Sequence, residues 1–179
     1  MYDKQREYTK FCFAFVYNNE EGKGGELMFD VVRLQINYHT LEQFKRFTEN
    51  GLEELSMLDE LHENMVENQV DSPFYGIYED GTLVARMSLY PINAKYDRYF
   101  DPPRDYLELW KLEVLPGSKG RGLGTQLVTY AKSLGHAIKV NVRGQSHPFF
   151  LQLGFTPVKY DAQRDRGENP YVWIPNDER

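Results

Sequence analysis

The sequence is poor in the residues that build disulfides and metal sites. It has a single cysteine, Cys12, among 179 residues. One thiol cannot form an intramolecular disulfide or supply the thiolate cluster of a structural zinc site. The four histidines show no metal-ligand spacing. We therefore expect no metal, and we expect the reducing cytoplasm as the compartment.

A basic excess and a long apolar run are also missing. The chain has 21 lysines and arginines against 27 aspartates and glutamates, a formal net charge of −6. Proteins that neutralise phosphates usually carry a basic excess, so we expect no nucleic-acid partner. A membrane-spanning helix needs about 20 apolar residues, and the apolar run 11–17 is far shorter. Acidic and glycine residues follow that run where a signal peptide would carry a small-residue cleavage site. We therefore expect no membrane partner.

The composition suits one compact domain, because 41% of the residues are hydrophobic and 15% are aromatic. Residues 1–27 differ from the rest, with a polar start, the aromatic run and a loop-like stretch. We predict an N-terminal extension over 1–27 and one domain over 28–179. Met28 is an alternative start, since residues 23–26 (KGGE) can be encoded by a purine-rich, ribosome-binding stretch. A genuine extension is the other interpretation.

Apolar spacing predicts a mixed α/β domain in which an antiparallel meander is followed by a βαβ step. Glu79-Asp80-Gly81 lies between two apolar runs, which indicates a hairpin. Thr40 is the predicted cap of the first helix. Strands are predicted over 31–37, 74–78, 82–90, 106–115, 137–142, 155–160 and 171–174, and helices over about 40–50, 53–68, 122–135 and 148–153.

A glycine-rich junction joins the strand 106–115 to the next helix. Glycines 120, 122 and 124 allow the backbone to approach a ligand closely. The helix start presents unpaired N–H groups and the positive end of the helix dipole, which together suit a pyrophosphate. Lys119 and Arg121 add positive charge. The spacing G-x-G-x-G matches neither the Walker A loop nor the dinucleotide fingerprint.

The junction resembles a known family motif. Lys119-Gly120-Arg121-Gly122-Leu123-Gly124 is similar to the Arg/Gln-x-x-Gly-x-Gly/Ala motif of the GNAT (Gcn5-related) N-acetyltransferases, with lysine where arginine or glutamine is usual. Residues 147–155 (HPFFLQLGF) resemble the family's F-Y-x-x-x-G-F signature. Segments 72–90, 105–117 and 164–170 resemble the YlbP-like group within that family. The resemblance implies the GNAT α/β fold: a mixed, mostly antiparallel sheet that is flanked by helices and splayed at a cofactor cleft. We expect the splay after Val114.

The resemblance also implies acetyl-CoA as the co-substrate. The main chain of the strand would bind the pantetheine arm, and backbone amides of the loop and the first helical turn would bind the pyrophosphate. Residue by residue, this implies Leu112, Glu113 and Val114 for the arm, and Lys119, Gly120, Arg121, Gly122, Leu123, Gly124 and Thr125 around the phosphates. The implied activity is direct transfer of an acetyl group to a primary amine. A non-catalytic acyl-CoA-binding or regulatory module is the alternative, and the acceptor and the choice between monomer and homodimer stay open.

Acetyl transfer requires a deprotonated amine, a stabilised oxyanion and a protonated thiolate. Glu108 lies six residues before Val114, a spacing that resembles the general-base glutamate of histone-type GNAT enzymes. It is the candidate base, and water-mediated deprotonation is the alternative. Glu108 and Glu113 differ by an odd number, so a regular strand places them on opposite faces. An amide of Leu112 or Val114 is expected to hold the oxyanion.

The usual acid is missing, because Phe150 stands where many family members carry tyrosine. Tyr106, Tyr130 or a bound water are the remaining donors. Trp110, on the central strand, is expected in the core. The loops 93–105 and 161–170 are expected to border the acceptor cleft, with Tyr96, Tyr99, Phe100 and Arg104 in the first and Arg164, Arg166 and Glu168 in the second.

Overall fold

A computed structural model describes residues 30–49, 57–67, 69 and 71–175, and the statements below concern those residues. The predicted extension 1–27 lies outside them, as does the end of the first predicted helix near Gly51. None of the described helices is both long and apolar enough to cross a membrane.

The domain is built on a seven-stranded sheet in the order β1-β2-β3-β4-β5-β7-β6. All neighbouring strands are antiparallel except β4 and β5, which are parallel, so the predicted mixed sheet is confirmed. The strands are β1 (Val31–Arg33), β2 (Phe74–Glu79), β3 (Thr82–Ile92), β4 (Tyr106–Val114), β5 (Ala137–Asn141), β6 (Thr156–Pro157) and β7 (Pro170–Trp173).

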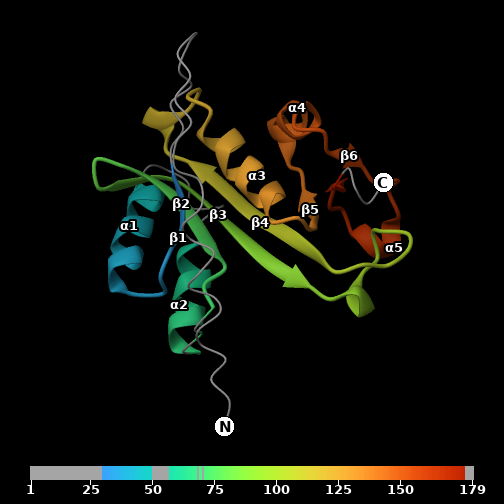
Figure 1. The fold of residues 1–179 in the computed structure, drawn as a ribbon, viewed down its shortest axis with the longest axis horizontal. Helices are drawn as coiled ribbons and strands as arrows, with labels where there is room; N and C mark the ends of the chain where they lie inside the picture. Colours follow the sequence, from blue (N-terminus) through green and yellow to red (C-terminus); the bar gives the residue numbers. More distant parts are fainter. Residues whose placement is uncertain (1–29, 50–56, 68, 70, 176–179) are drawn as a thin grey trace.

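Helices cover both faces of the sheet. The α-helices are α1 (Tyr38–Glu49), α2 (Leu58–Val66), α3 (Leu123–Ser133), α4 (His147–Gln152) and α5 (Ala162–Asp165). Figure 1 shows α1 and α2 on one side of the sheet, and α3 and α4 on the other. Phe44 and Phe47 of α1 are fully buried on the first side, and Leu127 and Val128 of α3 on the second. The apolar spacing of α1 and α3 therefore marks the faces that pack, whereas Val66 at the end of α2 is 81% exposed.

Several element boundaries differ from the prediction. The first strand is only three residues long, and the sixth has two residues where six were predicted. The carbonyl of the Asn37 side chain accepts from the Thr40 N–H at 2.9 Å, so α1 begins earlier than predicted and Thr40 is not its cap. The predicted loop 161–170 contains α5, which Asp161 caps through two backbone N–H groups.

The ladder between β4 and β5 is short. It runs from Tyr106↔Ala137 to Leu109↔Val140 and then stops, although β4 continues to Val114. The two parallel strands therefore part from Trp110 onward. We expected the splay after Val114, and that expectation is wrong by several residues. The C-terminal half of β4 consequently has no strand paired with it on the β5 side, and we call this unpaired side of β4 the gap.

A β-bulge on β4 coincides with the start of this gap. Ser88 pairs with Lys111 and Leu89 pairs with Leu109, so Trp110 is an extra residue on β4. A bulge shifts the alternation of side chains by one residue. Leu107, Leu109, Leu112 and Val114 accordingly all contact the α3-side core.

Polar side chains of β4 share the opposite face as a result. Lys111 reaches Glu60 of α2, and Glu113 reaches Arg86, whose guanidinium lies over two rings of α1. Glu108 lies opposite Tyr90 in the register of β4 with β3, and the Tyr90 hydroxyl donates to the same Glu60. The expectation that Glu108 and Glu113 lie on opposite faces is wrong, because it assumed a regular strand.

Candidate functional site

The glycine-rich junction forms a tight connection into α3. A 3-10 turn over Pro116–Ser118 follows β4. Gly120 and Gly122 then have φ values of +77° and +78°, in the left-handed region that favours glycine. Gly122 is the N-cap of α3, and the N–H of Gln126 donates to its carbonyl at 2.9 Å. The amides of Leu123, Gly124 and Thr125 therefore precede the first helical hydrogen bond and are free to bind an anion.

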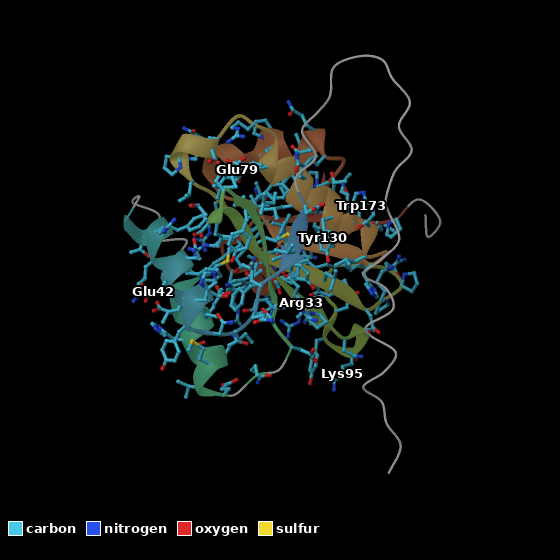
Figure 2. All side chains as sticks on the ribbon, turned by 60° about the vertical axis from the view of Figure 1, so that its left-hand side comes forward. Arg33, Glu42, Glu79, Lys95, Tyr130 and Trp173 are labelled. Carbon is cyan, nitrogen blue, oxygen red and sulfur yellow. The ribbon has the colours of Figure 1, made fainter. Side chains whose placement is uncertain are left out.

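One cation of the loop is fixed in place by the β2–β3 hairpin. Arg121 Nη1 lies 2.7 Å from Glu79 Oε2, and Figure 2 labels Glu79 beside the start of α3. Lys119 is exposed at the loop surface. The ion pair ties the loop to the sheet, which limits its movement where a phosphate would approach.

The backbone of β4 presents polar groups to the gap. The Leu115 N–H donates to the Val84 carbonyl at 2.9 Å, so this pair is a hydrogen-bonded pair of the β3–β4 ladder. Hydrogen-bonded and non-hydrogen-bonded pairs alternate along antiparallel strands. Leu112 and Val114 therefore direct their N–H and carbonyl groups away from β3, toward the side that β5 has left. These are the groups that the sequence assigns to the pantetheine arm and the oxyanion.

Glu113 has a different place. By the same alternation its backbone faces β3, where it pairs with Arg86. Its side chain forms a fully buried ion pair with that arginine, Oε2 to Nε at 2.5 Å. Burial raises the pKa of the Glu113 carboxyl to about 7, against the lowering effect of Arg86. The expected backbone contact from Glu113 to the pantetheine arm is therefore not supported by the register.

Apolar side chains of three elements meet beside the gap. A Cβ added at Gly124 would lie 3.4 Å from the Phe149 ring and 3.6 Å from Leu112 Cδ2. The first turn of α3, the helix α4 and the strand β4 therefore converge here. A Cβ at position 124 would be in van der Waals contact with Phe149 and Leu112, so glycine leaves this space unfilled.

The structure places no tyrosine where the family's usual acid is expected. Phe150 is 6% exposed, and its ring centroid lies 5.3 Å from that of Phe155. Phe150 is thus a core residue of α4. At the start of the same helix, His147 Nδ1 contacts the hydroxyl of Tyr171 on β7.

Tyr106 and Tyr130 lie away from the gap. Tyr106 is buried against the rings of Tyr99 and Phe100, and burial raises its pKa above the usual phenol range. It borders a surface hollow of about 250 Å³ at the start of β4, six residues or roughly 20 Å of strand before Leu112. Tyr130 packs on Tyr75 of β2, with ring centroids 5.3 Å apart. The candidate acid role of Tyr106 is therefore not supported.

Glu108 lies on the α2 side of β4 and is paired. Its Oε1 is 2.6 Å from Lys139 Nζ, and Lys139 is 3.8 Å from Glu168. Both Lys139 and Arg164 lie over the ring of Tyr99, at 4.9 and 5.2 Å from its centroid. The two loops expected to border an acceptor cleft thus meet around Tyr99, next to Glu108.

Sequence reasoning missed two residues near Glu108. Trp110 was expected in the core, yet 49% of it is exposed, because the bulge and the splay remove both neighbouring ladders there. Lys139 is nearly buried, and the signal for it was a lysine inside the apolar strand AIKVN. Its partner could not be read from the sequence, since β4 and β5 are joined only through α3.

Comparisons with known proteins agree with this geometry. The model of the acetyltransferase (GNAT) family matches residues 37–155. An uncharacterized N-acetyltransferase of Brevibacillus brevis is 63% identical over 148 residues, covering 83% of this chain and 96% of the relative. The Bacillus subtilis N-acetyltransferase YlbP is 56% identical over 152 residues, covering 85% and 95%.

Solved structures give the same result. The crystal structure of Bacillus subtilis YlbP in complex with coenzyme A superimposes with a TM-score of 0.70 at 56% identity, covering 83% of this chain and 98% of that one. The PaiA N-acetyltransferase of Thermoplasma acidophilum shares the fold, with a TM-score of 0.56 at 16% identity over 82% and 99% of the two chains. The glycine-rich junction, the splayed β4–β5 pair and these matches together show that the chain belongs to the GNAT acetyltransferase family and is an N-acetyltransferase, acetyl-CoA-dependent as the family is.

Proposed function

We propose that this protein transfers an acetyl group from acetyl-CoA directly to a primary amine in the gap between β4 and β5. The observation that carries the proposal is the direction of the Leu112 and Val114 backbone groups. They face the gap because β3 forms its hydrogen bonds with the alternate residues of β4, such as Glu113. The ladder between β4 and β5 ends at Leu109, so no strand pairs with Leu112 and Val114 on the other side. An extended amide-containing chain such as pantetheine can pair with them as a missing strand would.

The phosphates of the cofactor would bind at the start of α3. The free amides of its first turn and the positive end of the helix dipole favour an anion. Lys119 and Arg121 add charge at the same place, and the left-handed glycines let the backbone come close. The crystal structure of the relative YlbP contains coenzyme A, which supports this assignment. The residues proposed here are Lys119, Gly120, Arg121, Gly122, Leu123, Gly124 and Thr125.

The Leu112 amide is the proposed oxyanion donor. Of the two amides that face the gap, it is the nearer to Glu108 along the strand. The negative charge that develops on the thioester carbonyl in the tetrahedral intermediate would receive this N–H. The amine nitrogen forms the new bond to the carbonyl carbon, and the carbon–sulfur bond breaks to release the CoA thiolate.

Glu108 is the proposed general base. Leu112 is four positions further along β4, roughly 13 Å of strand, so bound water would relay the proton from the amine. Lys139 holds the carboxylate at 2.6 Å and fixes its direction. With Phe150 in place of tyrosine, water is the proposed proton donor to the departing thiolate.

A second candidate function is a non-catalytic acyl-CoA-binding module, which Phe150 favours. Two measurements separate the two functions. Calorimetry reports acetyl-CoA binding, and a thiol-reactive dye reports release of CoA in the presence of amines. Binding with amine-dependent thiol release supports transfer. Binding without release, over alkylamines, polyamines and lysine peptides, supports the module and contradicts our proposal.

A further inference from the structure

Trp110 is exposed at a place where a sheet normally buries its side chains. It lies on β4, the middle strand of seven, and 49% of it is exposed. Among the described strand residues, Val32 is the only other large apolar side chain that is exposed, and it lies on the edge strand β1. An indole left open on a central strand is apolar area that a ligand can cover.

The backbone explains why the indole is open. Trp110 is the extra residue of the bulge opposite β3, and it is the first residue after the β5 ladder ends. Leu109 before it contacts the α3-side core, and Lys111 after it reaches Glu60 of α2. The exposed indole therefore lies where the side chains of β4 change faces, between Glu108 and Lys111 along the strand.

The charged groups beside Trp110 are already paired. Glu108 is 2.6 Å from Lys139, and Glu60 is 2.6 Å from Lys111. Glu60 also accepts from the Tyr90 hydroxyl at 2.9 Å. Each carboxylate already faces one lysine ammonium, so these ion pairs leave little net negative charge to attract a second ammonium group of a ligand.

Trp110 is also close to the proposed chemistry. Leu112 is two positions further along the strand, roughly 6–7 Å away. A group on the indole is therefore within a few bonds of an amine that attacks a thioester at the Leu112 amide. We infer that Trp110 is a specificity-determining residue that packs an uncharged alkyl or aryl substituent of the acceptor amine. This inference rests on the proposed function.

The first test compares n-hexylamine with 1,6-diaminohexane, which has the same chain and a second ammonium group. We expect the wild type to prefer n-hexylamine. Its kcat/KM should rise from n-propylamine to n-hexylamine by about fourfold for each methylene group that contacts the indole. Trp110→Ala should raise KM and flatten this series with kcat largely kept, and Trp110→Phe should keep part of it. Tyr38→Ala, which removes a 76% exposed ring on α1, is the control and should leave the series unchanged.

The second test measures binding without turnover. The chain has two tryptophans, so Trp173→Phe leaves Trp110 as the sole indole. Titration of n-hexylamine into the complex with CoA, which has no acetyl group to transfer, should give a saturable change in fluorescence. A saturable change without thiol release from acetyl-CoA supports the substituent site and refutes the transfer. No saturable change, tighter binding of 1,6-diaminohexane, or an unaltered chain-length series in a folded Trp110→Ala variant overturns the inference.

Discussion

Arg86 of β3 and Glu113 of β4 form an ion pair, 2.5 Å from Nε to Oε2, in which both side chains are fully buried. The guanidinium lies over the rings of Phe44 and Phe47, 4.2 and 4.1 Å from their centroids. The pair therefore joins α1 to β4. The residues on either side of Glu113, Leu112 and Val114, direct their backbone groups to the proposed cofactor gap. Burial opposes charge on both partners, lowering the pKa of Arg86 and raising that of Glu113.

Removal of the arginine alone should be costly. Arg86→Met leaves the Glu113 carboxyl group buried without its partner, and we expect a loss of about 3–5 kcal/mol in the free energy of unfolding at pH 7. Denaturant titration measures this. The double variant Arg86→Met/Glu113→Leu should recover most of the loss, because no buried charge remains. A double variant as unstable as Arg86→Met would show that packing, not charge, dominates.

The pH dependence of stability should carry the signature of Glu113. The pKa of this carboxyl rises from 4.5 to about 7 on folding, so the folded protein holds the proton more tightly than the unfolded chain. Its contribution to stability is complete below pH 4.5 and is lost as the pH rises through 7. Unfolding measured at pH 5 and pH 8 should show this loss in the wild type. Glu113→Gln should remove that part of the slope, and an unchanged slope would contradict the assignment.

Glu108→Gln should lower kcat/KM by roughly 10²–10⁴-fold, the usual range for general acid–base catalysis. Steady-state kinetics on the wild type and the variant measure this loss. Acetyl-CoA affinity should stay the same, because Glu108 precedes the stretch that faces the gap.

The matched control for this variant is Glu42→Gln on the surface of α1, where the carboxylate pairs only with nearby Lys45 in the described contacts. It should keep full activity. Near-wild-type turnover in Glu108→Gln would mean that water is the base. The enzyme would then act mainly by holding the amine and the thioester together.

Gly122→Asp should abolish acetyl-CoA binding. The residue has a φ of +78° at the N-cap of α3, and a carboxylate there would repel the phosphates. Gly135→Asp is the matched control, since Gly135 has a φ of +77° after the far end of the same helix, and its Cβ would also meet nothing within 4 Å. Calorimetry should show intact binding in the control. Equal affinities in both variants would refute the site.

A chain that starts at Met28 should keep its melting temperature and its acetyl-CoA affinity, as expected if residues 1–27 are an extension. Thermal unfolding and calorimetry on the full and shortened chains measure both quantities. A large drop in the melting temperature would show that the aromatic run 11–17 stabilises the domain.

The sequence by itself determined the features that depend on neighbouring residues. Asp80-Gly81 forms the hairpin between β2 and β3 because both residues take positive φ there. The periodic apolar residues of α1 and α3 form the buried faces, because helical spacing brings them to one side. Gly120 and Gly122 of the junction take the positive φ values that other residues avoid, which is also a local property.

Tertiary structure decided the face on which the candidate catalytic groups lie. Strict alternation put Glu108 and Glu113 on opposite sides, but the bulge at Trp110 exists only in the pairing of β4 with β3. The splay begins at Trp110 because the β5 ladder ends at Leu109, which no local pattern records. The ion pair of Glu108 with Lys139 also joins residues 31 positions apart in the chain. Contacts between distant segments set these three features. A one-residue shift in strand register moves a side chain from one face of the sheet to the other, and the bulge at Trp110 did this for Glu113.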